Sequence, residues 1–285
     1  MRLFAHSTIL SRAICNALST DLALFTYPQI IDGLPTADVT WDRRFSDLFG
    51  EHPIEQHEEL CPGVMERAGE FRRGFDPSVL SFDSKAMDLA NPFPPVHPGS
   101  RLFSTRLIEV VAVALHEIGV LLFQIGLHLH HGDIATIDQW AESPHDTTLA
   151  PRPTLFSHHG YLHSSIYPDG VASIVGYWAE DRILGGVTVF DRSMEEVAPD
   201  SPPNVHFHPC RSKVTKRYCQ LRDDQQQALP NLADKTNTVR VNQEDAMLNN
   251  SYRDIWERVP PTARELDIIR RKTKKMWRII LSMRA

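Results

Sequence analysis

Several motifs that mark common enzyme classes are absent from this sequence. It contains no G-x-S-x-G elbow, no Walker loop and no G-x-G-x-x-G after a predicted strand. These absences argue against a serine hydrolase, a P-loop NTPase and a classical dinucleotide oxidoreductase. The H-E-x-x-H pattern of zinc proteases is also missing, because no second histidine follows His116 and Glu117 at the required spacing. Candidate chemistry must therefore come from clusters without an established signature.

Cysteine is scarce, with 4 in 285 residues. The four are Cys15, Cys61, Cys210 and Cys219. Since they form no C-x-x-C pair, we interpret them as reduced thiols in a reducing compartment. The first twenty residues lack the continuous apolar core of a secretory signal, although their early arginines and missing acids loosely fit an organellar transit peptide. We therefore expect a soluble, cytoplasmic protein.

The sequence has no overall surplus of basic charge. Its formal net charge is −6, so we expect no nucleic-acid partner. Residues 261–285 are the exception, because lysines and arginines there alternate with apolar side chains such as Trp277 and Leu281. This pattern predicts a basic amphipathic helix that contacts an acidic protein partner or a membrane surface. The alternative is a solvated helix whose apolar side packs on the chain's own core.

One long apolar run, residues 108–125, is the only candidate for a membrane span. Four polar residues interrupt it, namely Glu109, His116, Glu117 and Gln124. At 100° per residue they fall on one narrow stripe of a helix. Acidic groups near a bilayer centre cost on the order of 2.5 kcal/mol each. We therefore predict a buried helix that starts near Ser104, and no transmembrane segment.

Proline clusters divide the chain into three expected regions. The run Asn91–Gly99 contains four prolines and predicts a linker or extended arm. We expect a helical or irregular region over 1–99, an α+β core over 100–260 and the basic helix over 261–285. With 42% hydrophobic residues, the chain can bury a full-sized core, and we expect one domain overall.

Stretches rich in β-branched and aromatic residues predict a small antiparallel sheet. The predicted strands are residues 171–179, 187–191, 205–208 and 213–221. The acid-rich segment Glu180–Arg182 would form the turn after the first strand, and a short helix is expected at 225–229. The expected fold class is α+β: a helical N-terminal half around one long buried helix, a small antiparallel sheet and a helical C-terminal tail.

Three segments resemble a family of uncharacterised filamentous-fungal proteins. They are Gly176–Arg192, Val205–Pro209 and Gln220–Gln227, and the likeness extends over about residues 90 to 260. Some members of that family are encoded near secondary-metabolite gene clusters. The resemblance implies an accessory role in such biosynthesis, and it implies no fold, cofactor or catalytic residue.

Histidine is abundant, with 14 residues, and this suggests a metal site. His206 and His208 alternate on a predicted strand, so their side chains share one face and could bind one divalent ion. A third ligand would come from the histidines of two other clusters, which are His128, His130 and His131, and His158, His159 and His163. Such a site could serve hydrolysis or oxidation. The alternative is that these histidines lie in loops and bond to backbone groups.

The predicted central helix supplies the candidates for acid–base catalysis. Burial perturbs ionisable groups, so His116 and Glu117 could transfer protons near neutral pH. Tyr177, Trp178 and Glu180 could line a pocket for a small, largely apolar substrate. The alternatives are a structural pairing of the polar stripe with Arg106, core packing of the aromatic residues and cross-strand ion pairs.

These observations support three hypotheses. The leading hypothesis is an accessory enzyme of fungal secondary metabolism that acts on a small apolar substrate by acid–base chemistry. The second is a non-catalytic binding protein that uses the basic C-terminal helix. The third is a metal-dependent hydrolase or oxygenase with histidine ligands.

Overall fold

The long apolar run predicted as a helix forms α6 (Arg101–Ile125). Ser100 caps its first turn, because its side chain accepts the backbone N–H of Phe103 at 3.2 Å. Gly126 ends the helix with φ +63°, a left-handed conformation that favours glycine. Leu115, Ile118 and other apolar residues of α6 are fully buried. The predicted buried helix is therefore confirmed.

The structure is a computed structural model that describes part of the chain. The described residues are 2–43, 52–80, 100–138, 153–190, 205–210, 218–222 and 225–226. All of them belong to one compact unit, residues 1–243. The predicted linker Asn91–Gly99 and the predicted basic helix 261–285 lie outside the described residues, so the proposed division at these points stays a prediction.

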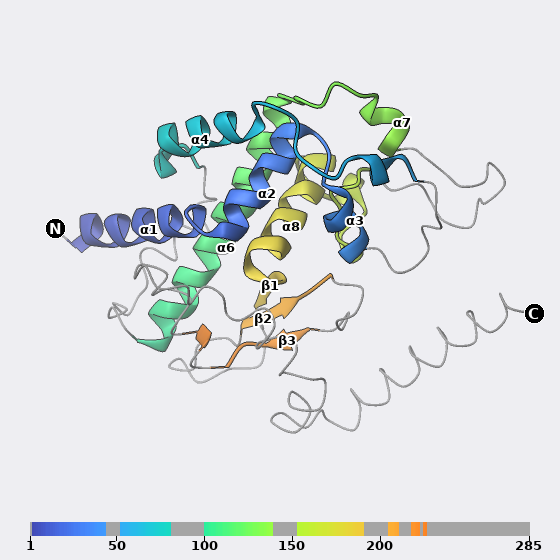
Figure 1. Ribbon diagram of the computed structural model, residues 1–285. Helices are drawn as coiled ribbons and strands as arrows, with labels where there is room; N and C mark the ends of the chain where they lie inside the picture. The colour runs from blue at the N-terminus through green and yellow to red at the C-terminus, as the bar shows by residue number, and fades with distance from the viewer. Residues whose placement is uncertain are drawn as a thin grey trace, which may run out of the picture. The chain divides into compact units, whose positions relative to one another are not determined.

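The described part of the chain contains further helices. They are α1 (Arg2–Leu18), α2 (Asp21–Asp32), α3 (Ala37–Arg43), α4 (Val64–Gly74), α7 (Ile134–Asp138) and α8 (Val171–Leu184). Among these, α1, α2 and α8 pack along α6, and α4 packs on α2 (Figure 1). The hydroxyl of Tyr27 on α2 donates to the carbonyl oxygen of Leu115 at 3.0 Å, which joins the two helices inside the core.

The prediction of a strand at 171–179 is wrong, because these residues form the first part of α8. Nearly every position of α8 is buried, since the helix lies between α2, α6 and the sheet. A helix that is buried on all sides loses the 3.6-residue hydrophobic period, and its β-branched residues then mimic a strand. The segment Glu180–Arg182 is accordingly the last turn of a helix and not a turn between strands.

A small antiparallel sheet follows α8. Its strands are β1 (Val187–Phe190), β2 (Val205–His208) and β3 (Cys219–Gln220), in the order β1-β2-β3. Val187 pairs with His208, and Phe207 also pairs with Cys219. The predicted strands at 187–191 and 205–208 are confirmed. Only residues 218–221 of the predicted strand 213–221 are described, and they contain β3. Of the predicted helix 225–229, residues 225–226 are described, and they are helical.

The described elements make the protein a mixed α+β fold. By length and composition alone, Phe103–Ile125 could also cross a membrane, with a mean hydropathy of 1.9 over an 18-residue window. The core helix of a soluble protein meets the same criterion, and 56% of that window is buried inside the structure. The packing of α1, α2 and α8 on α6 favours a core helix.

The closest packing of α6 and α8 occurs at Gly119 and gives a stability test. A Cβ atom at Gly119 would lie 3.1 Å from Ala179 Cβ and 3.2 Å from Gly176 Cα. We expect Gly119→Val to lower the free energy of unfolding by about 1–3 kcal/mol through overpacking. Urea unfolding followed by circular dichroism measures this loss.

The matched control is Gly69→Val on α4. A Cβ atom there would meet only the end of the flexible Arg73 side chain, at 3.3 Å. This variant should keep wild-type stability, because valine has a better helix propensity than glycine. Equal stability of both variants would contradict the proposed close packing.

Candidate metal centre

The two predicted proton-transfer residues lie next to each other on α6 and point in different directions. The ring of His116 packs against Tyr177, with 4.4 Å between ring centroids. Among the described residues, His116 Nδ1 has no hydrogen-bond partner. Burial lowers the pKa of His116 to about 4, and Asp169 only partly offsets this effect. Burial and the Asp169 carboxylate raise the pKa of Glu117.

The three residues predicted to line a pocket lie on α8 and have separate environments. Tyr177 is half-buried and stacks on Tyr161, with ring centroids 4.4 Å apart. Trp178 is fully buried and packs against Phe156 in the core. Glu180 is also buried, and its carboxylate accepts the backbone N–H of Thr188 at 2.6 Å. The structure therefore brings Tyr177 together with His116, whereas Trp178 and Glu180 are core residues.

The two predicted metal ligands lie on β2, as expected from the sequence. His206 is half-buried, while His208 is buried and its Nδ1 lies 3.3 Å from the hydroxyl of Tyr161. Within the described ranges, two groups of side chains bring three possible ligand atoms within 4.8 Å of one another. The groups are His57, Cys61 and His130, and His158, His159 and Cys210. Neither group contains His206 or His208.

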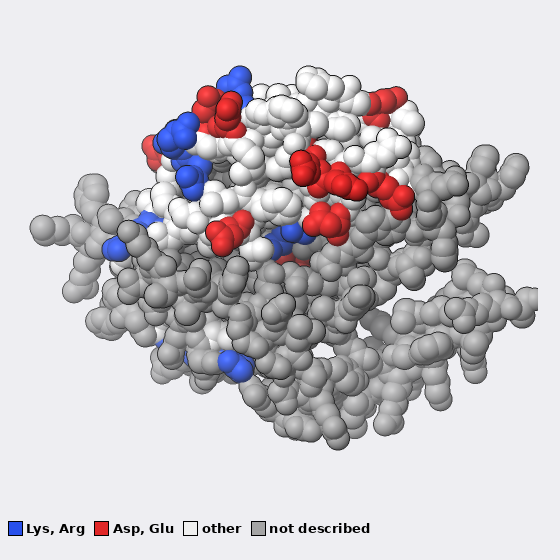
Figure 2. All heavy atoms as spheres, viewed as in Figure 1, with Lys and Arg blue, Asp and Glu red and all other residues white. Residues whose placement is uncertain are grey.

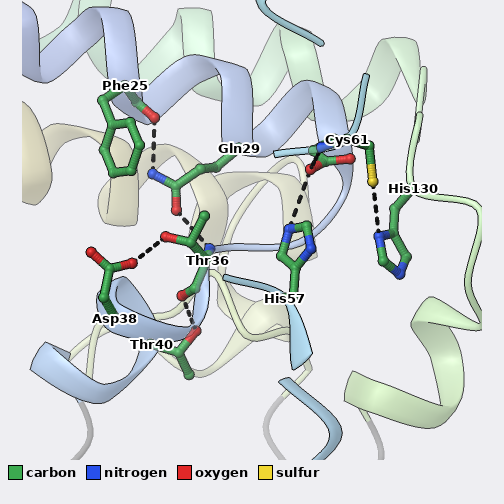
Figure 3. Close-up of polar contacts among 9 residues, drawn as sticks. Phe25, Gln29, Thr36, Asp38, Thr40, His57, Cys61 and His130 are labelled. Atoms are coloured by element: carbon green, nitrogen blue, oxygen red, sulfur yellow. Dashed lines mark hydrogen bonds and ion pairs between the residues drawn. The ribbon is translucent and has the colours of Figure 1, made fainter. Parts of the chain in front are cut away.

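The first group comes from two parts of the chain (Figure 3), and Asp32 contacts it from a third. Asp32 is the last residue of α2, and His57 follows a short 3-10 helix, Pro53–Gln56. Cys61 precedes α4, and His130 lies in the segment after α6. We call these four residues the first centre.

Backbone hydrogen bonds fix the position of His130. The end of α2 leaves carbonyl groups without helical partners, and two of them accept N–H groups from the segment after α6. Leu129 donates to Ile31 at 3.1 Å, and His130 donates to Asp32 at 2.8 Å. Gly33 permits this approach, because it has φ +100° and an added Cβ would lie 2.8 Å from His128 Nδ1.

The side chains of the first centre converge closely. Cys61 Sγ lies 3.3 Å from His130 Nδ1, and the rings of His57 and His130 meet edge to face, with centroids 5.0 Å apart. Asp32 Oδ2 accepts the backbone N–H of Cys61 at 3.0 Å and lies 3.2 Å from His57 Nε2. Asp32 thus contacts both the residue that carries the thiol and one of the imidazoles.

Two buried polar atoms of the first centre lack hydrogen-bond partners in the described part of the chain. They are Asp32 Oδ1 and His57 Nε2. The Nε2–Oδ2 contact is short enough for an ion pair, but its direction is not that of a hydrogen bond. The two side chains are 0% and 7% exposed, so both groups lie away from bulk solvent. A buried carboxylate oxygen without a hydrogen bond costs free energy, and a cation beside Asp32 would offset part of that cost.

An ion at the first centre would have to displace the proton of the Cys61 thiol. Burial and the Asp32 carboxylate raise the pKa of the Cys61 thiol, and the His131 backbone N–H opposes them. Burial and His57 lower the pKa of His130. Burial alone would raise the pKa of Asp32, but contacts with His57 and Cys61 lower it overall. The centre thus offers a neutral imidazole and a thiol beside a carboxylate.

The surface around the first centre is acidic. Figure 2 shows Asp and Glu side chains gathered over the middle and right of the face in view, with Lys and Arg side chains toward its left edge. The segment that carries His57 and Cys61 adds three exposed acids, Glu55, Glu58 and Glu59. Negative potential at a surface raises the local concentration of cations. This charge distribution favours the approach of a metal ion.

Sequence reasoning missed most of the first centre. His130 belongs to a histidine cluster that was considered as a source of a third ligand, but Asp32, His57 and Cys61 were not considered as ligands. The signal available was the His57-x-x-x-Cys61 spacing. Such a spacing is common by chance, and only the contact with residues 32 and 130 makes it specific.

Comparisons with known proteins add no independent assignment. No protein-family model, no curated protein and no solved structure matches the chain. The resemblance to the fungal family therefore stays a prediction. Any assignment of function must rest on the geometry and chemistry of the described residues.

The buried acid Glu180 gives a pH-dependent test. Burial raises the pKa of Glu180 from 4.5 to about 8. Its stabilising contribution is complete below pH 4.5 and is lost as the pH rises toward 8, because the unfolded chain ionises first. Between pH 5 and pH 8, the ionisation of Glu180 should lower the free energy of unfolding of the wild type by about 3 kcal/mol. Glu180→Gln cannot ionise and should not show this loss.

Urea unfolding at both pH values measures this difference. The glutamine carbonyl can still accept the Thr188 N–H, so the contact to β1 is kept. Glu66→Gln, at an exposed position of α4, is the control and should follow the wild type. Parallel stability profiles for the wild type and Glu180→Gln would show that burial does not perturb this carboxyl.

Proposed function

We propose that this protein is a zinc-dependent hydrolase whose ion is held by His57, Cys61 and His130. The observation that carries the proposal is the convergence of three ligand atoms within 4.8 Å, beside the buried Asp32 carboxylate, whose Oδ1 has no hydrogen-bond partner in the described part of the chain. A tetrahedral zinc with ordinary Zn–N and Zn–S bonds separates those ligand atoms by about 3.5 Å. The 3.3 Å between Cys61 Sγ and His130 Nδ1 is close to that separation.

The ligand types favour zinc over other metals. A thiolate with two imidazoles suits zinc, whereas calcium and magnesium prefer oxygen ligands. A non-haem iron site would use two histidines and a carboxylate. Asp32 does not join the group of close ligand atoms and instead contacts His57 and the Cys61 backbone. This is the position of a carboxylate that orients a metal-binding histidine.

Three protein ligands leave the fourth position of a tetrahedral ion for water. Structural zinc sites use four protein ligands, and catalytic sites commonly use three. When bound, zinc acts as a Lewis acid and lowers the pKa of its water to about 7. Cys61 and His130 are only half-buried, which leaves access from one side. Asp32 keeps the imidazole of His57 in place during turnover.

The substrate class is a small, largely apolar molecule with a hydrolysable bond. An apolar cavity of about 240 Å³ lies between α2 and α4, and Arg72 is the only charged residue that lines it. Its wall includes Ile31, the neighbour of Asp32, and Met65, which follows Cys61 by four residues. The cavity can hold the apolar part of a substrate close to the segments that carry the first centre.

Metal analysis of the full chain tests the proposal. After dialysis against a weak chelator, the wild type should keep one zinc per chain, and His57→Ala and Cys61→Ala should keep none. Asp32→Asn should weaken zinc binding about 10–100-fold, as expected for loss of an orienting carboxylate. Cys15→Ala, at an exposed cysteine, is the control and should bind zinc like the wild type.

Hydrolysis of 4-nitrophenyl acetate and butyrate tests the catalytic part. Zinc-loaded wild type should hydrolyse these esters, and Cys61→Ala should lose the activity together with the ion. A protein that binds one zinc tightly but gives no ester hydrolysis above the zinc-free protein would contradict the hydrolase and leave a structural ion. Absence of bound zinc in the wild type would contradict the whole proposal.

A second candidate function is the acid–base catalysis predicted from the sequence. The observation that favours it is the unpartnered Nδ1 of His116, which lies beside Tyr177. Since the pKa of His116 is about 4, this imidazole is a neutral base over the physiological pH range. Glu117 and Asp169 add carboxylates to the same area.

Zinc-free protein distinguishes the two candidates. Proton transfer at His116 predicts residual hydrolysis without zinc that stays constant from pH 7 to pH 5. His116→Gln should remove that residual activity, whereas Cys61→Ala should leave it unchanged. The same residual rate in His116→Gln and in the wild type would rule out a catalytic role for this histidine.

The broader hypotheses stay predictions. An accessory role in fungal secondary metabolism rests on the family resemblance, and a cytoplasmic location rests on the sequence signals. Contact with a protein or membrane through residues 261–285 falls outside the described residues. Zinc hydrolysis of a small apolar substrate is compatible with each of them.

A further inference from the structure

A second group of histidine and cysteine side chains lies away from α2 and α4, at the end of β2. His158 and His159 precede α8 in the chain, and Cys210 follows β2. His158 and Cys210 are 0% and 1% exposed, while His159 is half-buried. We call these three residues the second centre. The proposed hydrolase does not use them.

The second centre has the contacts of a thiolate–imidazole site. His159 Nδ1 lies 3.1 Å from Cys210 Sγ, and the backbone N–H of His159 donates to the same sulfur at 3.4 Å. The rings of His158 and His159 stack, with centroids 4.8 Å apart. One ligand atom from each of the three residues lies within 4.8 Å of the other two. The soft sulfur and two imidazole nitrogens suit zinc or a similar transition metal.

Hydrogen bonds orient His158 as a metal ligand. Its Nε2 lies 2.8 Å from the carbonyl oxygen of His208, which can only accept, so Nε2 carries the proton. The lone pair therefore resides on Nδ1, which accepts the Gly160 N–H at 3.1 Å. A metal-binding histidine commonly donates its other N–H to a backbone carbonyl in this way. The tautomer required for coordination through Nδ1 is thus already fixed.

The position of Cys210 is fixed from α8. The buried carboxylate of Asp181 accepts the backbone N–H of Cys210 at 3.2 Å. This bond holds the residue after β2 against the core, so the sulfur stays beside His159. Gly160 leaves room for the ring of His208 beside His158, because a Cβ there would lie 2.6 Å from His208 Cε1.

The geometry points to a second transition-metal site, formed by His158, His159 and Cys210, that binds zinc more weakly than the first centre. An ion must replace a cysteine–histidine contact at either centre, but at the second centre it must in addition displace the Gly160 N–H from His158 Nδ1. Loss of a buried hydrogen bond lowers affinity, so we expect a dissociation constant about tenfold or more higher. The second centre would fill only when metal is plentiful.

Cobalt titration of the full-length protein tests this site. Co²⁺ replaces zinc at such sites and gives a thiolate charge-transfer absorption when cysteine is a ligand. The variant His57→Ala/Cys61→Ala removes the first centre and should still bind one equivalent with that absorption. Adding Cys210→Ser or His159→Gln should remove the equivalent and the absorption.

Matched controls come from the same chain. Cys219→Ser alters a half-buried cysteine of β3, and His163→Gln alters an exposed histidine near the second centre. Both should leave cobalt binding unchanged in the His57→Ala/Cys61→Ala background. Retention of the full cobalt signal in both Cys210→Ser and His159→Gln would overturn the second site, and so would absence of any cobalt binding in the double variant.

Two further measurements test whether the variants fold and whether the two centres differ in affinity. Because Cys210 is buried, metal-free unfolding must show that Cys210→Ser folds, and His159→Gln provides a half-buried alternative. In the wild type, a competing chelator should remove the metal from the second centre at about one tenth or less of the free chelator concentration that empties the first centre. The cobalt signal in the His57→Ala/Cys61→Ala background depends neither on an ion at the first centre nor on ester hydrolysis, so the two proposals fail independently.

Discussion

The close contact between α6 and α8 determines how the rest of the described fold is arranged. Gly119 and Gly176 lie where the two helices approach, so the backbone of α8 packs directly on α6. This places α8 in the core, where two of its buried acidic side chains accept hydrogen bonds from neighbouring segments. Glu180 accepts an N–H from β1, and Asp181 accepts an N–H from the residue that follows Pro209. The sheet is therefore attached to the helical layer through paired polar groups rather than apolar contacts alone.

Much of the fold could be predicted from local pattern, and the main error has a physical cause. α6 has a capping serine, a terminal glycine and an apolar run interrupted by one polar stripe. The signals at its ends and its apolar pattern therefore predict the same helix. β1 and β2 are short and rich in β-branched and aromatic residues. α8 was misassigned because nearly all of its positions are buried, and such burial removes the hydrophobic period on which prediction depends.

The candidate centres differ in how far they depend on the fold. His206 and His208 were predicted as ligands from strand alternation, and the structure places His208 beside His158 and Tyr161. The first centre could not be predicted in this way, since Asp32, Cys61 and His130 are distant in sequence. Pattern methods detect ligands that lie on one element, whereas these side chains meet only because N–H groups after α6 cap the end of α2.

The contact between Cys61 and His130 joins residues 69 positions apart in the chain. An ion bound across that distance would stabilise the folded chain by linkage, because its ligands come together only in the fold. The unfolded chain keeps only the neighbouring pair His57 and Cys61 as a chelate, so it binds an ion weakly. Metal supply would then set how long the protein survives in the cell, since unfolded chains are continuously removed by proteases.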